Sequence, residues 1–545
     1  MTYKISYSTT KKHFCNCNKF IITICFDLYC KIKYFLFFIL FLNSVLVNYL
    51  YYKFFNNTNN CLIVFLSYSI NLNGCIIIKL IQWTNNQLLF VKNNNNNNND
   101  NNKFINQVFS KYYENCYVHS LNYTKSLFYE EFGIKFDDFF ELDTKYTIKS
   151  GSIAQVYKGI MKNSSFNPNF YVAIKVVHPE IKYQLIYPMY LFKIYNFLVN
   201  KYKCFKKYDT IFNFDDFFIN LEKQLSMINE YANNEYFYNK YYNHNIIVIP
   251  RPLMKSKHFL IMEYIEGEVF ETLNISNYKK QIIVCLIALF IKDVYMFGKY
   301  VHSDLHDANW KILRQHKPGC DDTYKIIIYD FGYVIENNLN ETVKKLIYYL
   351  DINNIHELGK LLFSEVQNLN IDYSNGLEVE LSREKFINEF VKYNEQSYPY
   401  TDSNYIAVYN FCLNNGYKLN NNLLDLFICT MLLHKYFRKY IFSIFIQENN
   451  TFDQTAYYKY IYNVNLYYIS ICDKYDVFYD VKNYINNNYI NNPFFLDTIS
   501  YNNNYFDNLS NKLHNELHNE LHNELHNELH NEQISNNECY ISIDI

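Results

Sequence analysis

Three groups of residues have the types and the spacing to bind nucleotide phosphates together with a metal ion. The first runs from Ile148 to Gly159 (IKSGSIAQVYKG) and is followed by YVAIKV at 171–176. A turn of small residues between two strands brings backbone N–H groups close to phosphate oxygens. The second strand then presents Lys175 as a point charge for the same phosphates. The segment therefore predicts a phosphate-binding turn backed by a lysine.

The second and third groups supply oxygen ligands. HSDLHDAN, from His302 to Asn309, fits the spacing H-x-D-x-x-x-x-N, in which the Asp positions an acceptor or a water and the Asn binds Mg²⁺. An apolar strand then leads to Asp330, which is followed by Phe-Gly and is the expected ligand of the second Mg²⁺ ion. Mg²⁺ prefers such oxygen ligands and takes phosphate and water in its other positions. The order and spacing of all three groups predict a kinase-like site for ATP and Mg²⁺.

The candidate site residues follow from these motifs. We expect Asp304 and Lys175 to act in catalysis, and Asn309 and Asp330 to bind the metal. The segment IMEYIEG, which contains Glu263, reads as a strand that ends in a polar turn and suits the connection between two lobes. The expected nucleotide-binding residues are Ser150, Gly151, Ser152, Ala154, Gln155, Lys175 and Glu263.

The elements that position these residues read as strands first and helices later. Residues 148–175 and 247–264 alternate like strands, whereas 211–240 reads as a helix. From Ser276 onward the pattern is helical, apart from a short apolar strand at Tyr324–Tyr329. This order predicts an α+β, protein-kinase-like fold of two lobes. The expected boundaries are 103–266 for the N-lobe and 267–480 for the helical C-lobe.

The N-terminal region contains a candidate membrane helix. Residues 1–33 are basic and resemble a targeting segment, since no acidic residue precedes Asp27. The apolar stretch Tyr34–Tyr52 would span about 28 Å as a helix, close to the thickness of the hydrocarbon core. Asn43, Ser44 and Asn48 interrupt this stretch, so a buried core helix is the alternative.

Two segments are of low complexity. Residues 93–102 are almost entirely Asn and are expected to form a solvated loop. In the tail, 481–545, the unit Leu-His-Asn-Glu repeats from Leu513 to Glu532. His514 and His518 have the i, i+4 spacing of a metal-binding pair. A disordered or frayed repeat without a metal is the preferred interpretation.

Composition excludes several classes of function. The 545 residues carry a formal net charge of −2, which gives no basic surface for nucleic acid, so no nucleic-acid partner is expected. The 14 Cys residues are scattered without a pattern typical of a zinc site. Asn and Tyr are abundant throughout the chain, so a single residue of either type carries little functional information.

The sequences of these motifs resemble those of the ABC1/UbiB (ADCK, Coq8-like) family of atypical kinases, and within it those of the ADCK2-type members. SIAQVY at 152–157 and VAIKVVHP at 172–179 are similar to that family's SIAQVH and VAVKVxHP, and HSDLHDAN resembles its HADxHPGN. Upstream, IKLIQW at 78–83 resembles its KxGQ segment. The resemblance runs from about residue 74 to 450 and implies a kinase-like fold with an added N-terminal helical segment, here 61–92.

The same resemblance implies a gate over the active site. In the family, the KxGQ segment blocks protein substrates and favours ATP hydrolysis or a small acceptor. Carried over, Lys79 and Gln82 form this gate, while Ile81 replaces the family's Gly and departs from its tight turn.

An acidic partner for the phosphate lysine is less evident. Gln224 stands where many family members have this acid. Glu230, in the sequence EYAN, resembles a Glu of the family's E-A-x-N helix and is the candidate partner, with Glu222 as a substitute. A surface position on a helix is the alternative for Glu230.

The resemblance implies a membrane-associated ATPase or atypical kinase that supports ubiquinone biosynthesis or lipid homeostasis. Its expected cofactors are ATP and Mg²⁺, and its expected partners are a membrane lipid or quinone precursor and proteins of ubiquinone biosynthesis. The expected location is the mitochondrial inner membrane, with a single-pass or peripheral attachment. Two alternatives stay open: a non-catalytic, nucleotide-binding pseudokinase scaffold, and a protein kinase that acts in trans.

Overall fold

The structure is a computed structural model of the 545 residues. It describes residues 6–55, 58–81, 116, 118–146, 148–162, 170–202, 214–315, 323–367, 371, 374–396, 404–442 and 454–500. The chain forms two compact units. Unit 1 comprises Met1–Thr210, Phe217–Ile228 and Leu253–Met262, and unit 2 comprises Ile211–Asp216, Asn229–Pro252 and Glu263–Ile545.

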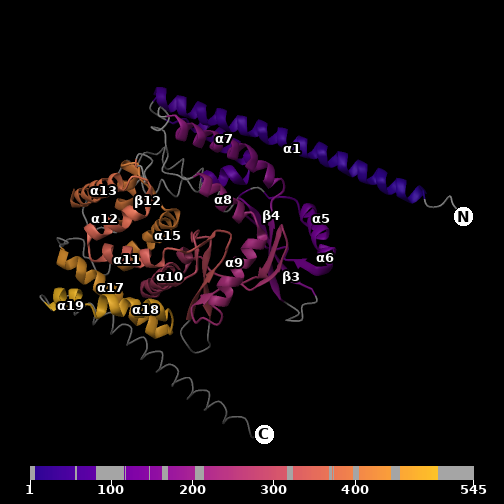
Figure 1. The fold of residues 1–545 in the computed structure, drawn as a ribbon. Coiled ribbons are helices and arrows are strands. Elements are labelled where there is room, and N and C mark those ends of the chain that lie inside the picture. Colours follow the sequence, from indigo (N-terminus) through magenta and orange to yellow (C-terminus); the bar gives the residue numbers. More distant parts are fainter. Residues whose placement is uncertain are drawn as a thin grey trace, which may run out of the picture. The chain divides into compact units, whose positions relative to one another are not determined.

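Unit 1 combines a sheet of six strands with helices (Figure 1). Its strands are β1 (Phe140–Leu142), β2 (Lys149–Ser150), β3 (Ala154–Met161), β4 (Tyr171–Val177), β6 (Pro252–Lys255) and β7 (Phe259–Glu263). Its helices are α1 (Ser6–Phe55), α2 (Asn60–Asn73), α5 (Leu121–Phe132), α6 (Phe136–Phe139), α7 (Ile181–Lys201) and most of α8 (Phe214–Gln224). Residues 75–81 are also helical. The strand order is β1-β3-β4-β7-β6, and β2 pairs with β3.

The core of unit 1 lies on one face of this sheet. β4 (YVAIKVV) buries Val172, Ile174 and Val176 completely, because alternate residues of a strand point to the same side. Aromatic side chains from α5, α6, β1 and β7 complete the cluster: Phe128, Phe136, Phe140 and Phe259. Burial of these large side chains is the main stabilising contribution in this part of the chain.

The N-terminal helix α1 packs against α2 and α7, and Figure 1 shows it as one long helix beside α7. The predicted helix at 34–52 is thus part of a longer element, since no Pro or Gly interrupts residues 6–55. Of the helices that the structure describes, one stretch, Ile24–Phe55, is long and apolar enough to cross a membrane, by length and composition alone. Only 22% of its most apolar window is buried.

Unit 2 is mostly helical. Its helices are most of α9 (Met227–Lys240), then α10 (Asn277–Phe297), α11 (Asn340–Asp351), α12 (Ile355–Ser364), α13 (Gly376–Gln396), α14 (Asn404–Asn414), α15 (Asn421–Phe437), α17 (Gln454–Tyr475), α18 (Tyr479–Ile485) and α19 (Pro493–Ser500). Its strands are β5 (Ile247–Val248), β8 (Tyr300–His302), β9 (Trp310–Gln315), β10 (Thr323–Ile328), β11 (Val334–Glu336), β12 (Val366–Gln367) and β13 (Lys418–Leu419). They form the sheets β5-β10-β9, β8-β11 and β12-β13.

The predicted α+β organisation is confirmed, with two differences in detail. The single helix expected at 211–240 is two helices, α8 and α9. The expectation that one strand alone follows Ser276 is wrong, because β9 pairs along its whole length with the predicted strand β10, and β8 pairs with β11. The Asn-rich segment 93–102 and the repeat containing His514 and His518 lie outside the described residues.

Candidate functional site

The predicted phosphate-binding turn is a tight connection between two paired strands. Ser150 of β2 lies opposite Gln155 of β3, and three residues, 151–153, join the two strands. The N–H of Gly151 donates to the carbonyl oxygen of Ala154 at 3.0 Å and closes the turn. Ser150 and Ser152 are buried, whereas Gly151 is half-buried. Because Gly151 has no side chain, the part of it that is open to a ligand is its backbone.

Lys175 lies on the strand next to this turn. It is paired with Val156, the third residue of β3. Its neighbours Ile174 and Val176 are fully buried in the core, so the alternation of β4 places Lys175 on the opposite face of the sheet. The Lys175 side chain is half-buried there. Adjacent strands of one sheet thus carry the predicted turn and the predicted phosphate lysine.

A buried polar network lies beneath the turn. Two of its residues, Gln155 and His178, belong to the motifs SIAQVY and VAIKVVHP, but neither motif indicated the network itself. His178 Nε2 is 3.1 Å from the carbonyl oxygen of Gly151, and His178 Nδ1 is 2.9 Å from Nδ1 of His119. Burial lowers the pKa of His119 to about 3 and also lowers the pKa of His178. Gln155, a predicted nucleotide ligand, is fully buried, and its side chain binds the backbone N–H and carbonyl of His119. This network supports the turn from the interior.

In unit 2, the segment from His302 to Asn309 forms a compact loop after β8. His302 Nε2 donates to the carbonyl oxygen of Tyr329 at 3.1 Å, and its Nδ1 accepts the N–H of Asp304 at 3.3 Å. These two bonds require a neutral ring, and burial lowers the pKa of His302 accordingly. Asn309 donates to the carbonyl of Asp304 at 2.7 Å and accepts the N–H of Tyr329 at 2.8 Å. The loop therefore holds Asp304 and Asn309 beside the residue that precedes Asp330.

Asp330 and Glu230 bring two carboxylates to Gly332. Asp330 has a left-handed backbone (φ 53°), which is rare for a residue with a side chain and clusters at functional sites. A Cβ on Gly332 would lie 3.1 Å from Asp330 Oδ1 and 3.6 Å from Glu230 Oε2. Asn233, also on α9, donates to the carbonyl of Phe331 at 3.0 Å and fixes the helix there. Glu230 is only 1% exposed, so the alternative of a surface position is wrong for this residue.

These donors fit a Mg²⁺ ion. Asp330 offers a carboxylate oxygen, and Asn309 keeps its amide oxygen because its NH₂ group makes the bond to Asp304. Glu230 supplies a second carboxylate close to Asp330. Among the residues that the structure describes, no group of three or more His, Cys, Asp or Glu side chains is arranged to hold a metal alone. Carboxylate and amide oxygens are the ligands that Mg²⁺ prefers, and Mg²⁺ fills its other positions with phosphate and water.

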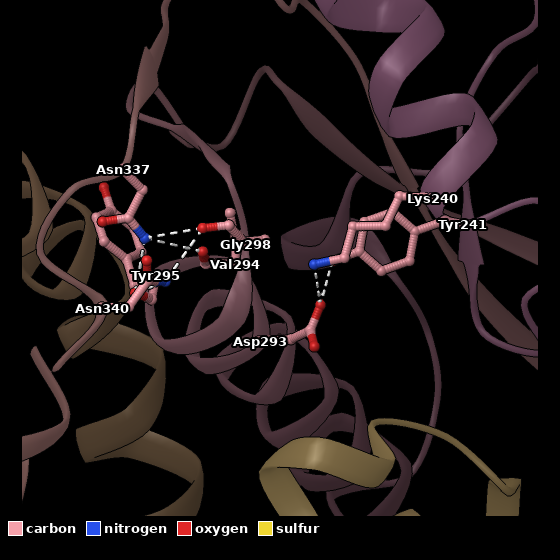
Figure 2. A network of polar contacts seen from close by, with 8 residues as sticks. All are labelled: Lys240, Tyr241, Asp293, Val294, Tyr295, Gly298, Asn337 and Asn340. Carbon is pink, nitrogen blue, oxygen red and sulfur yellow. Dashed lines mark hydrogen bonds and ion pairs between the residues drawn. The ribbon is translucent and has the colours of Figure 1, made fainter.

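A polar network lies at the end of α10 (Figure 2), close in the chain to β8, which leads into the predicted catalytic loop, residues 302–309. The last carbonyls of a helix have no partner within the helix. Here Asn337 Nδ2 donates to the carbonyls of Val294, Tyr295 and Gly298 at up to 3.4 Å, and Asn340 Nδ2 also donates to those of Tyr295 and Gly298. On the same helix, Asp293 accepts from Lys240 at 2.7 Å and Tyr241 at 2.6 Å. Asn337 directly follows β11, the partner of β8, so it ties both strands to α10.

Asp425 is a second functional candidate that the sequence did not indicate. It lies on α15, is 4% exposed and accepts a hydrogen bond from the hydroxyl of Tyr333 at 3.0 Å. The carbonyl of Tyr333 accepts the N–H of Ser303 at 3.0 Å, so Asp425 supports the catalytic loop through one residue. Burial, together with the nearby charge of Asp304, raises the pKa of Asp425 to about 8.

The predicted gate is described in part. Lys79 lies on the helical segment 75–81 and is half-buried. The first N–H of this segment, from Cys75, donates to Oε1 of Gln184 on α7 at 2.8 Å. Gln82 lies outside the described residues, so the geometry of the Lys79–Gln82 gate stays a prediction.

Three further predicted residues have defined positions. Glu263 ends β7, where its N–H donates to the carbonyl of Arg251 at 2.9 Å and its carboxylate accepts the N–H of Arg251 at 3.4 Å. Gln224 ends α8 and is half-buried, whereas Glu222 on the same helix is exposed. Lys175 lies in unit 1 and Glu230 in unit 2, so their pairing stays a prediction, with Glu222 as the substitute.

Residues 112–358 match the model of the ABC1 atypical kinase-like domain. This segment contains the predicted phosphate-binding turn, Lys175, the predicted catalytic loop and Asp330. The ABC1 family is therefore supported for this part of the chain. Together with the α+β architecture of two units, the match confirms the predicted kinase-like fold with an N-terminal helical segment.

Two proteins of Saccharomyces cerevisiae are similar to part of this chain. The ABC1 family protein MCP2 is 27% identical over 216 residues, which cover 38% of this chain and 37% of that protein. The ABC1 family protein YPL109C, mitochondrial, is 24% identical over 220 residues, which cover 36% of this chain and 33% of that protein. The chain thus spans about a third of the length of these curated relatives.

Among solved structures, the complex of Rv3197 with erythromycin from Mycobacterium tuberculosis is 16% identical and covers 59% of this chain and 83% of its own, with a TM-score of 0.37. The Rio2 kinase from Chaetomium thermophilum, in complex with ADP/Mg²⁺ and phosphoaspartate, is 10% identical and covers 63% and 86%, with a TM-score of 0.25.

Proposed function

We propose that this chain binds ATP with Mg²⁺ and hydrolyses it, or transfers its γ-phosphate to a small acceptor, as a membrane-associated atypical kinase of the ABC1/UbiB type. The observation that carries this proposal is the catalytic loop of unit 2. Asp304 and Asn309 are hydrogen-bonded to each other there, and the loop is bonded to the residue before Asp330. A loop held in this way positions oxygen ligands before any ligand arrives.

Each site residue has a role in this proposal. The turn at Gly151 supplies backbone donors to the phosphates, and Lys175 neutralises their charge. Asp304 orients the attacking water or hydroxyl and accepts its proton. Asn309, Asp330 and the nearby Glu230 would hold Mg²⁺, which when bound neutralises charge on the phosphate oxygens.

The nature of the acceptor separates the main proposal from its alternatives. By its resemblance to the family, the gate at Lys79 favours hydrolysis or a small acceptor, and a role in ubiquinone biosynthesis or lipid homeostasis. Ile81 and Gln224 depart from the family pattern and favour the second candidate, a nucleotide-binding scaffold without turnover. A protein kinase acting in trans ranks third, because no Ala-Pro-Glu motif follows Asp330. We also propose that the chain belongs to the ADCK2-type subgroup of the family.

Turnover distinguishes these readings. The full chain is purified, and phosphate release from ATP is measured with Mg²⁺, with and without vesicles and a soluble quinone-precursor mimic. We expect turnover that Asp304→Asn lowers at least a hundredfold while nucleotide binding persists. If the natural sequence binds nucleotide but shows no turnover, the proposed enzymatic activity is refuted and the nucleotide-binding scaffold is favoured. Stimulation by the mimic would support a quinone-related ligand, and phosphorylation of added protein would favour the kinase in trans.

The pairing of α1 with α2 supports a location in a membrane. Ser44 of α1 is fully buried and hydrogen-bonded to Ser69 of α2 at 2.8 Å, and Asn48 donates to the carbonyl of Leu62 at 3.0 Å. Asn73 of α2 donates back to the carbonyl of Phe37 at 2.8 Å. Polar groups satisfied between two helices, with apolar residues outside, are typical of helix pairs in lipid.

The outer face of this helix pair is apolar. Large side chains are 39–59% exposed at Leu36, Ile39, Leu46, Leu50, Val64 and Phe65. Asn43 is also exposed, as the exception among the Asn and Ser residues of 34–52. An apolar face of this size on a surface marks a contact with membrane or protein. We assign it to the mitochondrial inner membrane, in keeping with the mitochondrial designation of one yeast relative.

Vesicle flotation tests the membrane assignment. The full chain is mixed with phosphatidylcholine–cardiolipin vesicles, and the fraction that floats is measured. We expect the triple variant Leu36→Lys, Leu46→Lys, Leu50→Lys to lose flotation, because each Lys is costly in hydrocarbon. The matched control is Tyr129→Lys, Ile134→Lys, which changes exposed apolar residues of unit 1 outside the helix pair. Equal flotation of all three proteins would contradict the assignment.

A further inference from the structure

Five buried side chains form a continuous line of hydrogen bonds that ends on the phosphate-binding turn. None of them is more than 8% exposed. The line runs from Gln155 to Tyr157, then to Thr124, His119, His178 and the carbonyl oxygen of Gly151. The segments that contribute to it come from α5, β3 and the residues before α5 and after β4. Nothing in the proposed chemistry uses these side chains directly.

The polarity of the line is fixed from the Gly151 end. A carbonyl oxygen only accepts, so Nε2 of His178 carries a proton. A neutral His178 must then accept at Nδ1, so His119 donates from its own Nδ1 at 2.9 Å. His119 consequently accepts at Nε2, from the hydroxyl of Thr124 at 3.0 Å. The hydroxyl oxygen of Thr124 is left to accept from Tyr157 at 2.9 Å.

The other end independently requires the same polarity. The side-chain oxygen of Gln155 accepts the backbone N–H of His119 at 2.9 Å, and its NH₂ group donates to the carbonyl of His119 at 3.2 Å. These two backbone groups fix the orientation of the amide, so the atom of Gln155 that meets Tyr157 is a donor. Tyr157 therefore accepts from Gln155 and donates onward. The two ends agree, and every member has one consistent role.

The Gly151–Ser152 peptide, at the end of the line, sets the direction of a backbone N–H in the turn. In a planar trans peptide the carbonyl and the following N–H point in opposite directions. Because the Gly151 carbonyl points inward to His178, the N–H of Ser152 points away from it. Gly151 also donates its own N–H to Ala154, which fixes the peptide on its other side. The orientation of one backbone donor in the turn is thus set by His178.

We propose that His119, Thr124, Tyr157, Gln155 and His178 form a directional relay that holds the Gly151–Ser152 peptide with its N–H toward the nucleotide phosphates. The relay rests on the proposed nucleotide site and assigns positioning roles to residues outside it. Gln155 acts here as a support of the turn, not as a direct ligand. Reversal of a single donor anywhere along the line leaves a neighbouring pair with two donors or two acceptors.

Thr124 provides the sharpest test, because it is fully buried and lies three hydrogen bonds from Gly151. Thr124→Val keeps the shape of the side chain and removes the hydroxyl, whereas Thr124→Ser keeps the hydroxyl. Mg-ATP affinity of the full chain is measured by calorimetry for both variants. We expect Thr124→Val to bind about tenfold more weakly, the loss of about one net hydrogen bond. Thr124→Ser should retain most of the affinity of the natural sequence.

A second pair of variants and a control address folding. His178→Leu should lose affinity as Thr124→Val does, and His178→Gln should restore most of it, because an amide also donates to Gly151 and accepts from His119. Ile70→Val lowers the stability of unit 1 in a separate hydrophobic cluster that contains no member of the relay. It should leave ATP affinity within about twofold of the natural value, by the usual independence of distant sites.

Amide hydrogen exchange of residues 150–153, without nucleotide, keeps the relay testable even if ATP does not bind. Exchange there should rise at least tenfold in Thr124→Val and not in Thr124→Ser or Ile70→Val. Failure of the natural sequence to bind ATP would refute the proposed function alone. Equal exchange and equal affinity in Thr124→Val and Thr124→Ser would refute the relay.

Discussion

Replacement of Asp425 by Asn should change how the stability of unit 2 depends on pH. Burial raises the pKa of Asp425 to about 8, from the ordinary value of 3.8. Between these two values the folded chain keeps a proton that the unfolded chain has released, so the free energy of unfolding falls as pH rises. Above about pH 8 both states are ionised at this position and the effect levels off. Asn does not titrate, and its amide oxygen still accepts the hydrogen bond from Tyr333.

The size of the effect follows from the two pKa values. Each pH unit between them contributes about 1.4 kcal/mol, less near each end, so from pH 5 to pH 8 the natural chain loses on the order of 4 kcal/mol relative to Asp425→Asn. Urea unfolding of the full chain in detergent measures this difference. Trp310 is buried in β9 of unit 2 and serves as the fluorescence probe, in a Trp83→Phe background.

The control is Asp480→Asn, which removes an exposed carboxylate of the same unit. It should follow the pH dependence of the natural chain to within a few tenths of a kcal/mol, as exposed charges usually do. Parallel curves for Asp425→Asn and the natural chain would refute the reasoning, because Asp425 would then titrate at an ordinary pKa and would not be buried as described.

Three further predictions concern the supports of the site. Gly74→Ala should destabilise unit 1 by about 3 kcal/mol in urea unfolding, because φ is +78° and the new Cβ would lie 2.3 Å from Oε1 of Gln184; an unchanged midpoint would contradict this close contact. Asn337→Ala should cost about 1 kcal/mol by the same assay in unit 2 and lower turnover, since it removes hydrogen bonds to the end of α10 while Asn340 still donates to Tyr295 and Gly298; full stability would show that Asn340 and water replace the amide. A double-mutant cycle of Lys33→Met and Glu180→Gln should give a coupling of about 1 kcal/mol for their 2.7 Å ion pair, whereas additive effects would show that α1 is not held by it.

The sequence predicted the elements whose pattern is local. The alternation around Gly151, the apolar run before Asp330 and the spacing from His302 to Asn309 each specify a strand or a loop without reference to distant residues. The single helix expected at 211–240 broke into two at a place with no Gly or Pro to mark it. β8 and β11 are three residues each, too short to show a period, and exist because they pair with each other.

The supporting residues could not be predicted from the sequence, because their roles depend on partners far away in the chain. His119 meets His178 at a separation of 59 residues, and Tyr333 meets Asp425 at a separation of 92. No spacing pattern in the sequence predicts that a single His or Asp is buried, or which residue it contacts. Gln155 belongs to a motif of the family, and the sequence alone could not separate contact with nucleotide from support of the turn.

The effect of Mg²⁺ on ATP affinity is the most direct test of the proposed site for ATP and Mg²⁺. ATP affinity of the full chain is measured with and without Mg²⁺ for the natural sequence, Asp330→Asn and the control Asp480→Asn. We expect Mg²⁺ to strengthen ATP binding at least tenfold in the natural chain and in the control. Asp330→Asn should lose this gain but keep the affinity for ATP that is measured without Mg²⁺. An equal gain from Mg²⁺ in Asp330→Asn, or no ATP binding by the natural chain, would contradict the proposed site.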